Sequence, residues 1–273
     1  EVQAGRGTTD GAVFLDASHL GAQFVEQTFP GMTERCRDVG LDLARDPVKV
    51  SPTAHFHMGG ALIDASCRTG LEGLFVAGED AGGVHGANRL GGNGVAESTV
   101  FGARAGDAMA EYVRDRSQPV VSSEQVETVV GEVAGPLNGG GDGNIFEIRK
   151  EIEDLMWGKV GLVRDGSGLE EALRSLDAMS ERLRGTSVPP LREYNIAWQE
   201  WLNVRSILTV ATLTALSALA RTESRGSHYR TDYPETDDAR WLRNVFVQLG
   251  DDGAPRTWDE EVKFTRRRPP GSV

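Results

Sequence analysis

The side chains best able to do chemistry in this chain lie between residues 51 and 106. Two imidazoles, His55 and His57, flank Phe56, and Arg89 follows within a glycine-rich stretch. The planar guanidinium of Arg89 can donate two parallel hydrogen bonds to a carboxylate. A surface ion pair for Arg89 and a structural role for the histidine are the alternatives. The combination favours a site that holds an anionic ligand.

A carboxylate pair follows a short apolar run. Residues 73–78 begin and end with glycine and are apolar between, which predicts a buried strand of a parallel sheet. Glu79 and Asp80 come directly after it. Ligands of open α/β sheets bind beyond the carboxyl ends of the strands. Glu79 is therefore placed to accept hydrogen bonds from sugar-like hydroxyls, although the pattern also permits an exposed acidic turn.

Glycine dominates the next stretch, with six glycines among residues 81–94. Glycine lets the backbone approach a ligand closely and adopt positive φ. We expect a helix from about Asn93, whose first N–H groups would face an anion or an electron-rich ring. Small residues recur every four positions along one face of that helix, at Gly94, Ser98, Gly102 and Gly106.

Together these motifs resemble the flavoprotein subunit of succinate dehydrogenase and fumarate reductase, a close relative of L-aspartate oxidase. The resemblance is carried by SPTAHFHMGG at 51–60 and VAGEDAGGVHGANRLGGNG at 76–94, in which HGANRLGGN is highly specific. It extends over essentially the whole chain, through AGRG at 4–7, DASHLG at 16–21, AWQEWLNV at 197–204 and RTESRGSHYRTDYPETDDARWL at 221–242.

The resemblance implies a function and assigns residues to it. His55 and Arg89 match the substrate-binding and catalytic positions, and Glu79 matches the glutamate that contacts FAD. Gly94 and Val95 stand where backbone amides approach the flavin, and they replace the family's usual serine and leucine. The implied reaction is hydride transfer between FAD and a C4 dicarboxylate. No metal site is implied.

Two expected features are missing from the printed sequence. The family's GxGxxG fingerprint for FAD occurs nowhere in the 273 residues. By the resemblance, the capping-domain arginine that delivers a proton would precede Glu1. We therefore expect the C-terminal half of a flavoprotein, inactive alone, whose partners are the N-terminal FAD-domain half and an iron–sulfur subunit. L-aspartate oxidase, or a related soluble flavin oxidoreductase, and a non-catalytic partner-binding fragment remain as alternatives.

Composition excludes some classes of function. A net charge of −12 argues against nucleic-acid binding, which needs clustered Lys and Arg. The two cysteines, Cys36 and Cys67, show neither metal-ligand spacing nor a disulfide framework. The longest uncharged run, residues 206–220, is shorter than the roughly 20 apolar residues of a membrane span, so we expect a core helix. These features predict a cytoplasmic protein without a direct membrane span, associated with membranes only through partner subunits.

The predicted fold is the α/β part of an FAD-binding, glutathione-reductase-like domain joined to an all-α C-terminal three-helix bundle. We assign residues 1–50 to the end of the capping domain and its return to the flavin domain, and 51–116 to the C-terminal part of the FAD-binding domain. Residues 117–143 form a connector, and 144–273 a helical domain with an extended tail. The connector is rich in Ser, Val, Glu and Gly.

Periodic apolar residues predict the three helices. The first stripe is Ile145, Ile148, Ile152 and Leu155, and the second is Leu169, Leu173, Leu176 and Leu183. A third helix is expected to open at Pro189-Pro190 and to run through Trp198, Trp201, Leu202 and Leu208. These stripes are core packing and not cofactor contacts.

Residues 221–240, which we call the latch, are too polar and too closely set with charges for a helix interior. In the family that the chain resembles, this segment folds back towards the flavin and capping domains. The pattern therefore favours an inter-domain latch over a plain surface loop. Contact with an electron-transfer partner is a further alternative.

Overall fold

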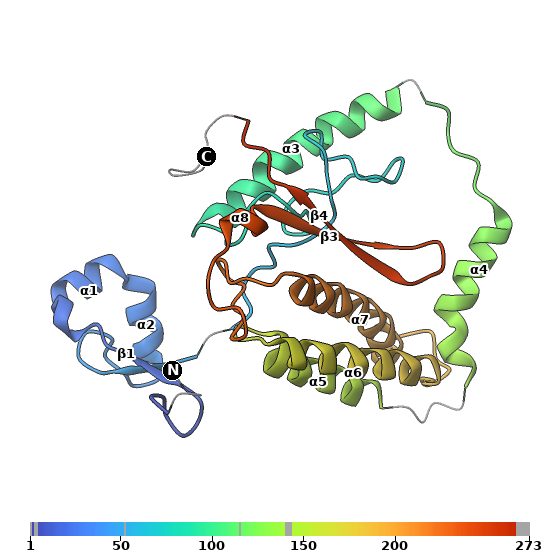
Figure 1. Ribbon diagram of the computed structural model, residues 1–273. Coiled ribbons are helices and arrows are strands. Elements are labelled where there is room, and N and C mark those ends of the chain that lie inside the picture. The colour runs from blue at the N-terminus through green and yellow to red at the C-terminus, as the bar shows by residue number, and fades with distance from the viewer. Residues whose placement is uncertain (1, 3–4, 52, 115, 140–143, 266–273) are drawn as a thin grey trace. The chain divides into compact units, whose positions relative to one another are not determined.

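The computed structural model describes residues 2, 5–51, 53–114, 116–139 and 144–265 (Figure 1). Its chain divides into two compact units, Glu1–Phe56 and His57–Val273. The division falls inside the segment 51–116, which the sequence assigns to the FAD-binding domain. The substrate histidine and the substrate arginine of the sequence prediction therefore belong to different units.

The first unit is a small antiparallel sheet with short helices. Its elements are β1 (Val13–Leu15), η1 (Ser18–Leu20), α1 (Ala22–Thr28), α2 (Pro30–Asp38) and β2 (Val48–Val50). Phe14 pairs with Lys49 at the centre of the sheet. Proline suits the first position of α2 because its φ is already helical and its missing N–H is not needed there. Val25 and Cys36 lie in a small core with Leu43 and Ala44.

The second unit begins with residues 57–92, which we call the glycine segment. The predicted strand at 73–78 is wrong: Phe75 makes only an isolated bridge to Arg68, and the Val76 N–H donates to the Cys67 carbonyl at 3.0 Å. A strand requires a ladder of paired residues along a neighbouring chain. Among the described residues this run has one bridge, to Arg68, so the ladder does not extend into a strand. Residues 53–60 are likewise neither helix nor strand.

The predicted helix after the glycine segment is confirmed. α3 (Asn93–Arg114) begins at the expected residue. Its buried residues are Glu97, Ala105 and Ala108. Spacings of eight and three residues, close to two turns and one turn of helix, place these three on one face. The expected stripe of small residues lies on another face, where Ser98, Gly102 and Gly106 are exposed.

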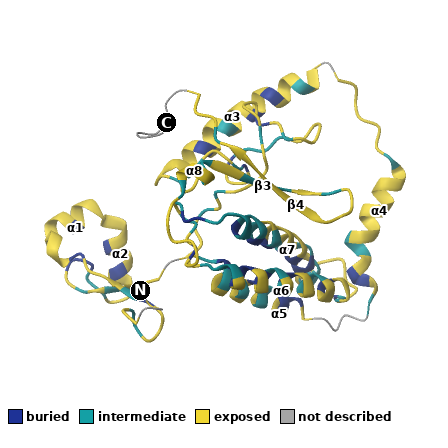
Figure 2. Cartoon of the chain, viewed as in Figure 1, coloured by how far each residue is buried: buried dark blue, intermediate teal, exposed yellow. Residues whose placement is uncertain are grey.

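Three helices and a π-helical turn form the main hydrophobic core, which we call the helical core. Its elements are α5 (Ile145–Leu155), η3 (Met156–Val160), α6 (Gly166–Arg184) and α7 (Ile196–Ala220). Figure 2 shows the buried positions gathered where α5, α6 and α7 lie together. The two predicted leucine and isoleucine stripes supply much of this core, through Ile145, Ile148, Ile152, Leu169, Leu176 and Leu183.

The third helix starts later than the sequence predicts. Residues 189–195 form a loop, and α7 begins after Asn195. The Asn195 side chain accepts from the Trp198 N–H at 3.0 Å and donates to the carbonyls of Pro189 and Leu191, both at 2.7 Å. The Asn195 side chain thus makes hydrogen bonds both to a first-turn amide of the helix and to carbonyls of the preceding loop. It is a stronger signal for the start of a helix than the proline pair.

The connector and the C-terminal domain contain elements that the sequence prediction lacked. The connector holds α4 (Ser123–Ala134) and η2 (Gly135–Asn138), with Ser122 capping α4. The end of the latch overlaps α8 (Asp238–Trp241), and a hairpin of β3 (Arg243–Leu249) and β4 (Pro255–Glu261) follows. The expectation of an all-α domain is therefore wrong. In the hairpin Phe246 stacks on Trp258 with ring centroids 5.2 Å apart.

Some remaining sequence expectations concern cysteines, membrane spans and the tail. Cys36 and Cys67 are free and buried. Among the described residues one helix, α7, is long and apolar enough to cross a membrane, with a mean hydropathy of 1.4. Its buried face belongs to the helical core, so its apolar residues have a packing role. Residues 266–273 of the predicted tail and residues 140–143 of the connector lie outside the described residues.

Candidate functional site

Arg89 lies four residues before α3, in a loop that is open on one side. Gly92 has φ +83°, in the left-handed region that favours glycine. A Cβ placed on Gly91 or Gly92 would meet nothing within 4 Å. Leu90 beside them is 75% exposed. The backbone next to Arg89 therefore faces open space into which a ligand could fit.

A buried pair fixes the two ends of this loop to each other. The His85 Nε2 lies 2.7 Å from the Glu97 Oε2, and both side chains are almost fully buried. Glu97 stands on the first turns of α3, so the pair ties the start of the loop to the helix that follows it. The second carboxylate oxygen of Glu97, Oε1, is buried without a hydrogen-bond partner among the described residues.

Glu79, the predicted FAD contact, is tied to the histidine motif. Its Oε1 accepts the His57 N–H at 2.8 Å. The neighbouring chains pair as well, since the Ala61 N–H donates to the Asp80 carbonyl at 2.8 Å. A Cβ on Gly60 would lie 2.3 Å from that carbonyl oxygen, so glycine is required there. The structure thus brings residues 57–61 alongside the Glu79 turn.

His55 is exposed and belongs to the first unit. Arg89, Glu79, Gly94 and Val95 all belong to the second unit. The joint hold of His55 and Arg89 on one substrate therefore stays a prediction. Gly94 and Val95 lie in the first turn of α3, where the N–H groups have no intrahelical acceptor.

The latch is an ionic and hydrogen-bonded cluster built around a buried glutamate. Glu223 is fully buried and accepts from the Arg225 guanidinium at 2.8 and 3.0 Å, from the Asp237 N–H at 2.9 Å, and from Arg221. Burial acts to raise the pKa of Glu223, but these donors outweigh it and hold the pKa below its usual range. The carboxylate therefore stays charged and organises the first half of the latch.

Two further latch residues anchor it to the helical core. The guanidinium of Arg230, 2% exposed, donates to the Ala218 carbonyl at 3.0 Å, near the end of α7. It also makes a bidentate pair with Asp232, at 2.7 and 2.6 Å. Asp232 in turn accepts the Gly166 N–H of α6 at 3.0 Å. These hydrogen bonds give partners to a carbonyl near the end of α7 and to an amide at the start of α6.

His228 adds a link that depends on its neutral form. Its Nδ1 lies 2.7 Å from the Arg164 guanidinium, which donates to it, and its Nε2 lies 3.3 Å from the Arg221 carbonyl. Burial, followed by the nearby Arg164 charge, lowers the pKa of His228 to about 4. The imidazole is thus neutral at physiological pH.

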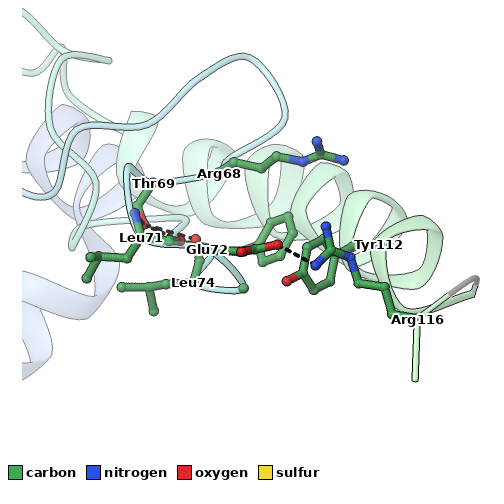
Figure 3. A pocket seen from close by; sticks show the side chains of 9 residues that line it. Arg68, Thr69, Leu71, Glu72, Leu74, Tyr112 and Arg116 are labelled. Atoms are coloured by element: carbon green, nitrogen blue, oxygen red, sulfur yellow. Dashed lines mark hydrogen bonds and ion pairs between the residues drawn. The ribbon is translucent and has the colours of Figure 1, made fainter. Parts of the chain in front are cut away.

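One surface depression contains none of the predicted site residues. It is lined by Glu72, Phe75, Tyr112 and Arg116, with an ion pair between Glu72 and Arg116 and the Arg116 guanidinium 3.9 Å from the Tyr112 ring centroid (Figure 3). Tyr112 is 18 residues along α3 from Gly94, or about 27 Å at 1.5 Å per residue. The depression is therefore at the other end of α3 from the Arg89 loop, and its side chains largely satisfy one another.

Two family models match the chain. The model described as fumarate reductase flavoprotein C-term matches residues 149–272, and the model described as FAD binding domain matches residues 1–95. The L-aspartate oxidase of Rhodospirillum rubrum is 38% identical over 243 residues, which are 88% of this chain and 76% of that protein. The chain belongs to the succinate dehydrogenase and fumarate reductase flavoprotein family, which includes L-aspartate oxidase.

Other members of the family are longer than this chain. One subunit of the fumarate reductase (CoM/CoB) of Methanothermobacter marburgensis is 41% identical over 251 residues, covering 90% of this chain and 45% of that protein. The structure of an E. coli quinol fumarate reductase superposes with a TM-score of 0.82 at 33% identity, over 96% of this chain and 46% of that one. The chain spans about half the length of several curated relatives that it matches.

FAD is the cofactor of the flavoprotein family. The Arg89 loop and the start of α3 could contact one side of an FAD ring. Open space beside Gly91 and Gly92 leaves room for a planar ring, and the first-turn amides of α3 offer donors to its electron-rich edge. In the described part of the chain, no three His, Cys, Asp or Glu side chains gather as metal ligands.

The sequence prediction missed the buried pair that holds the Arg89 loop. His85 and Glu97 are 12 positions apart, across a loop and a helix start, so no periodicity links them. A signal was available for Glu97 alone: it stands eight and eleven residues before Ala105 and Ala108, close to two and three helical turns, which places it on the same face. A charged residue on a buried face calls for a partner.

Proposed function

We propose that the complete protein transfers a hydride between FAD and a C4 dicarboxylate, and that this chain supplies the substrate arginine and part of the flavin site. The observation that carries the proposal is the position of Arg89, in an open glycine loop held by a buried pair directly before a 22-residue helix. No GxGxxG fingerprint occurs in the chain. We therefore propose that turnover requires the N-terminal half of the protein.

The residues of this chain would act by holding charge. The Arg89 guanidinium would bind one substrate carboxylate through two parallel hydrogen bonds, and His55 would bind and polarise the other end. The first-turn amides of α3, at Gly94 and Val95, would face negative charge that develops at the cofactor edge. FAD, when bound, supplies the hydride acceptor or donor. Glu79 would hold a cofactor hydroxyl while fixed by the His57 amide.

Electrons would leave or enter through a further partner. We propose an iron–sulfur subunit for that role, as the family resemblance implies, with any membrane association made through such subunits. The net charge of −12 supports the exclusion of nucleic acid as a partner.

The Arg89→Lys variant of the complete protein tests the proposal. Lysine keeps the charge but loses the planar fork. We expect kcat/KM for succinate or fumarate to fall about 30- to 1000-fold, the range for removing one such charged hydrogen bond at a site that excludes water. The FAD content, read from visible absorbance, should stay normal. Arg114→Lys, at the exposed far end of α3, is the matched control and should change kcat/KM by less than about twofold.

Two results would overturn the assignment. One is an Arg89→Lys enzyme with near-normal kcat/KM. The other is a variant that loses its FAD while Arg114→Lys retains it, because Arg89 would then hold the cofactor and not the substrate.

L-aspartate oxidation is a second candidate, supported by the match that covers 76% of an L-aspartate oxidase. An α-amino dicarboxylate carries the same two carboxylates, so Arg89 could hold it equally well. Ammonia and peroxide released from L-aspartate by the complete protein, without succinate or fumarate turnover, would replace the first proposal by this one.

A further inference from the structure

The latch touches the Arg89 loop directly. The Ala87 carbonyl, two residues before Arg89, accepts both the Ser227 N–H at 3.0 Å and the Ser227 hydroxyl at 3.1 Å. The two residues are 140 positions apart in the sequence. A residue of the C-terminal domain therefore fixes one peptide plane of the loop that carries the proposed substrate arginine.

The approach is close enough to demand glycine at the preceding position. Gly226 has φ +59°, and a Cβ there would lie 2.3 Å from the Ala87 oxygen and 2.6 Å from its carbonyl carbon. Backbone atoms cannot move aside as a flexible side chain can. Any larger residue at position 226 must push either the turn or the loop.

The latch side of this contact is rigid, so the loop is the part that would move. The turn is closed by hydrogen bonds in both directions between Arg225 and His228, at 2.8 and 3.0 Å. Arg225 is held by Glu223, and His228 by Arg164, as described above. The loop side has instead exposed residues and open space beside its glycines.

We propose that the Gly226–Ser227 turn is a positioning element for Arg89, through which the C-terminal domain sets the geometry of the substrate clamp. The inference rests on the proposed role of Arg89. Neither Gly226 nor Ser227 contacts substrate: they act through the Ala87 peptide. A displacement of about 1 Å at a binding group costs up to a hundredfold in rate.

Gly226→Ala in the complete protein is the decisive variant. We expect hydrogen exchange of the Ser227 amide, which donates to the Ala87 carbonyl of the loop and whose exchange rate we call loop exchange, to accelerate at least about tenfold, with α5, α6 and α7 unchanged. The dissociation constant for the dicarboxylate, measured by flavin difference spectra, and KM should rise about tenfold or more, within the range for a misplaced binding group. FAD content should stay normal.

Gly253→Ala is the matched control. Gly253 also has positive φ, at +77°, but a Cβ there would meet nothing within 4 Å. It carries the same backbone strain in the β3–β4 turn without touching the loop. Loop exchange and dicarboxylate affinity should stay within about twofold of the unmodified protein, because the strain remains local.

Ser227→Ala provides a second, milder test if Gly226→Ala fails to fold. It removes the hydroxyl bond and keeps the amide bond, so we expect a weakening of dicarboxylate binding of about two- to fivefold, the scale of one hydrogen bond. Unchanged loop exchange in Gly226→Ala, or in Ser227→Ala where only that variant folds, would overturn the proposal. So would faster loop exchange with unchanged dicarboxylate affinity. An Arg89→Lys variant with near-normal kcat/KM would instead overturn the proposed function. In that case loop exchange would still report whether the latch holds the loop.

Discussion

The helical core and the glycine segment belong to one compact unit but are held in different ways. The helical core buries a continuous set of leucines, isoleucines and valines from α5, α6 and α7. In the glycine segment, Cys67 and Ala81 are among the few buried apolar residues, and its described contacts are largely backbone hydrogen bonds. The residues proposed for chemistry lie in or beside the less packed part.

This difference shows how a poorly packed segment can still present a fixed side chain. Loops that bind ligands are drawn from the less stable parts of a fold, and their precision comes from rigid neighbours. Here the neighbours are α3, through the His85–Glu97 pair, and the latch, through Ser227 and Ala87. The latch is itself fixed to the helical core by Arg230.

The largest effect on the stability of the helical core should come from Arg230→Ala. The substitution leaves Asp232 without its bidentate partner and exposes unsatisfied carbonyls at the end of α7. Breaking a buried charged pair typically costs about 3–5 kcal/mol. Because Asp232 is partly exposed, we expect Arg230→Ala to lower the free energy of unfolding by an amount in the lower part of that range. Urea denaturation measures it.

Arg243→Ala is the control in the same domain. Its pair with Asp259 is 2.7 Å long, but both side chains are more than 40% exposed. Exposed pairs contribute about 1 kcal/mol or less. Equal losses in the two variants would contradict the view that the latch is part of the core.

A smaller effect should appear in the pH dependence of stability. The pKa of His228 is about 4 in the folded chain against an ordinary value of 6.5, so the unfolded chain binds the proton more tightly. The stability contribution is fully present above pH 6.5 and is lost as the pH falls from 6.5 to 4. For a partly exposed group we expect a loss of about 1–2 kcal/mol.

Unfolding free energies of the unmodified chain and of His228→Asn, measured between pH 7 and 4, isolate this contribution. Asparagine can still accept from Arg164 but does not titrate. The unfolding free energy should fall less steeply with decreasing pH in His228→Asn than in the unmodified chain. Parallel curves would show that His228 is not the titrating group and that the latch is less buried than described.

The sequence predicts well what periodic apolar residues or specific motifs determine. The isoleucine and leucine stripes of α5 and α6 follow directly from burial of one helix face, and Asn93 is the observed start of α3. The HGANRLGGN motif predicts the family, which the comparisons support. The roles of His55, Arg89, Glu79, Gly94 and Val95 stay predictions.

Other features depend on contacts between distant segments. Residues 73–78 have a strand-like composition, but a strand forms only where neighbouring strands pair with it. The β3–β4 hairpin carries a local signal that the prediction did not use: Val245, Phe246 and Val247 are strand-favouring residues shortly before a Gly-Asp-Asp-Gly turn. The Ser227–Ala87 contact joins residues 140 positions apart, and no local pattern encodes it.

Native-state hydrogen exchange of the 273-residue chain tests most directly whether the helical core folds independently and supports the glycine segment. We expect the slowest exchange in α5, α6 and α7 and fast exchange across residues 57–92, with the Ser227 amide protected by its bond to the Ala87 carbonyl. Slow exchange confined to the glycine segment, with the helices unprotected, would contradict it.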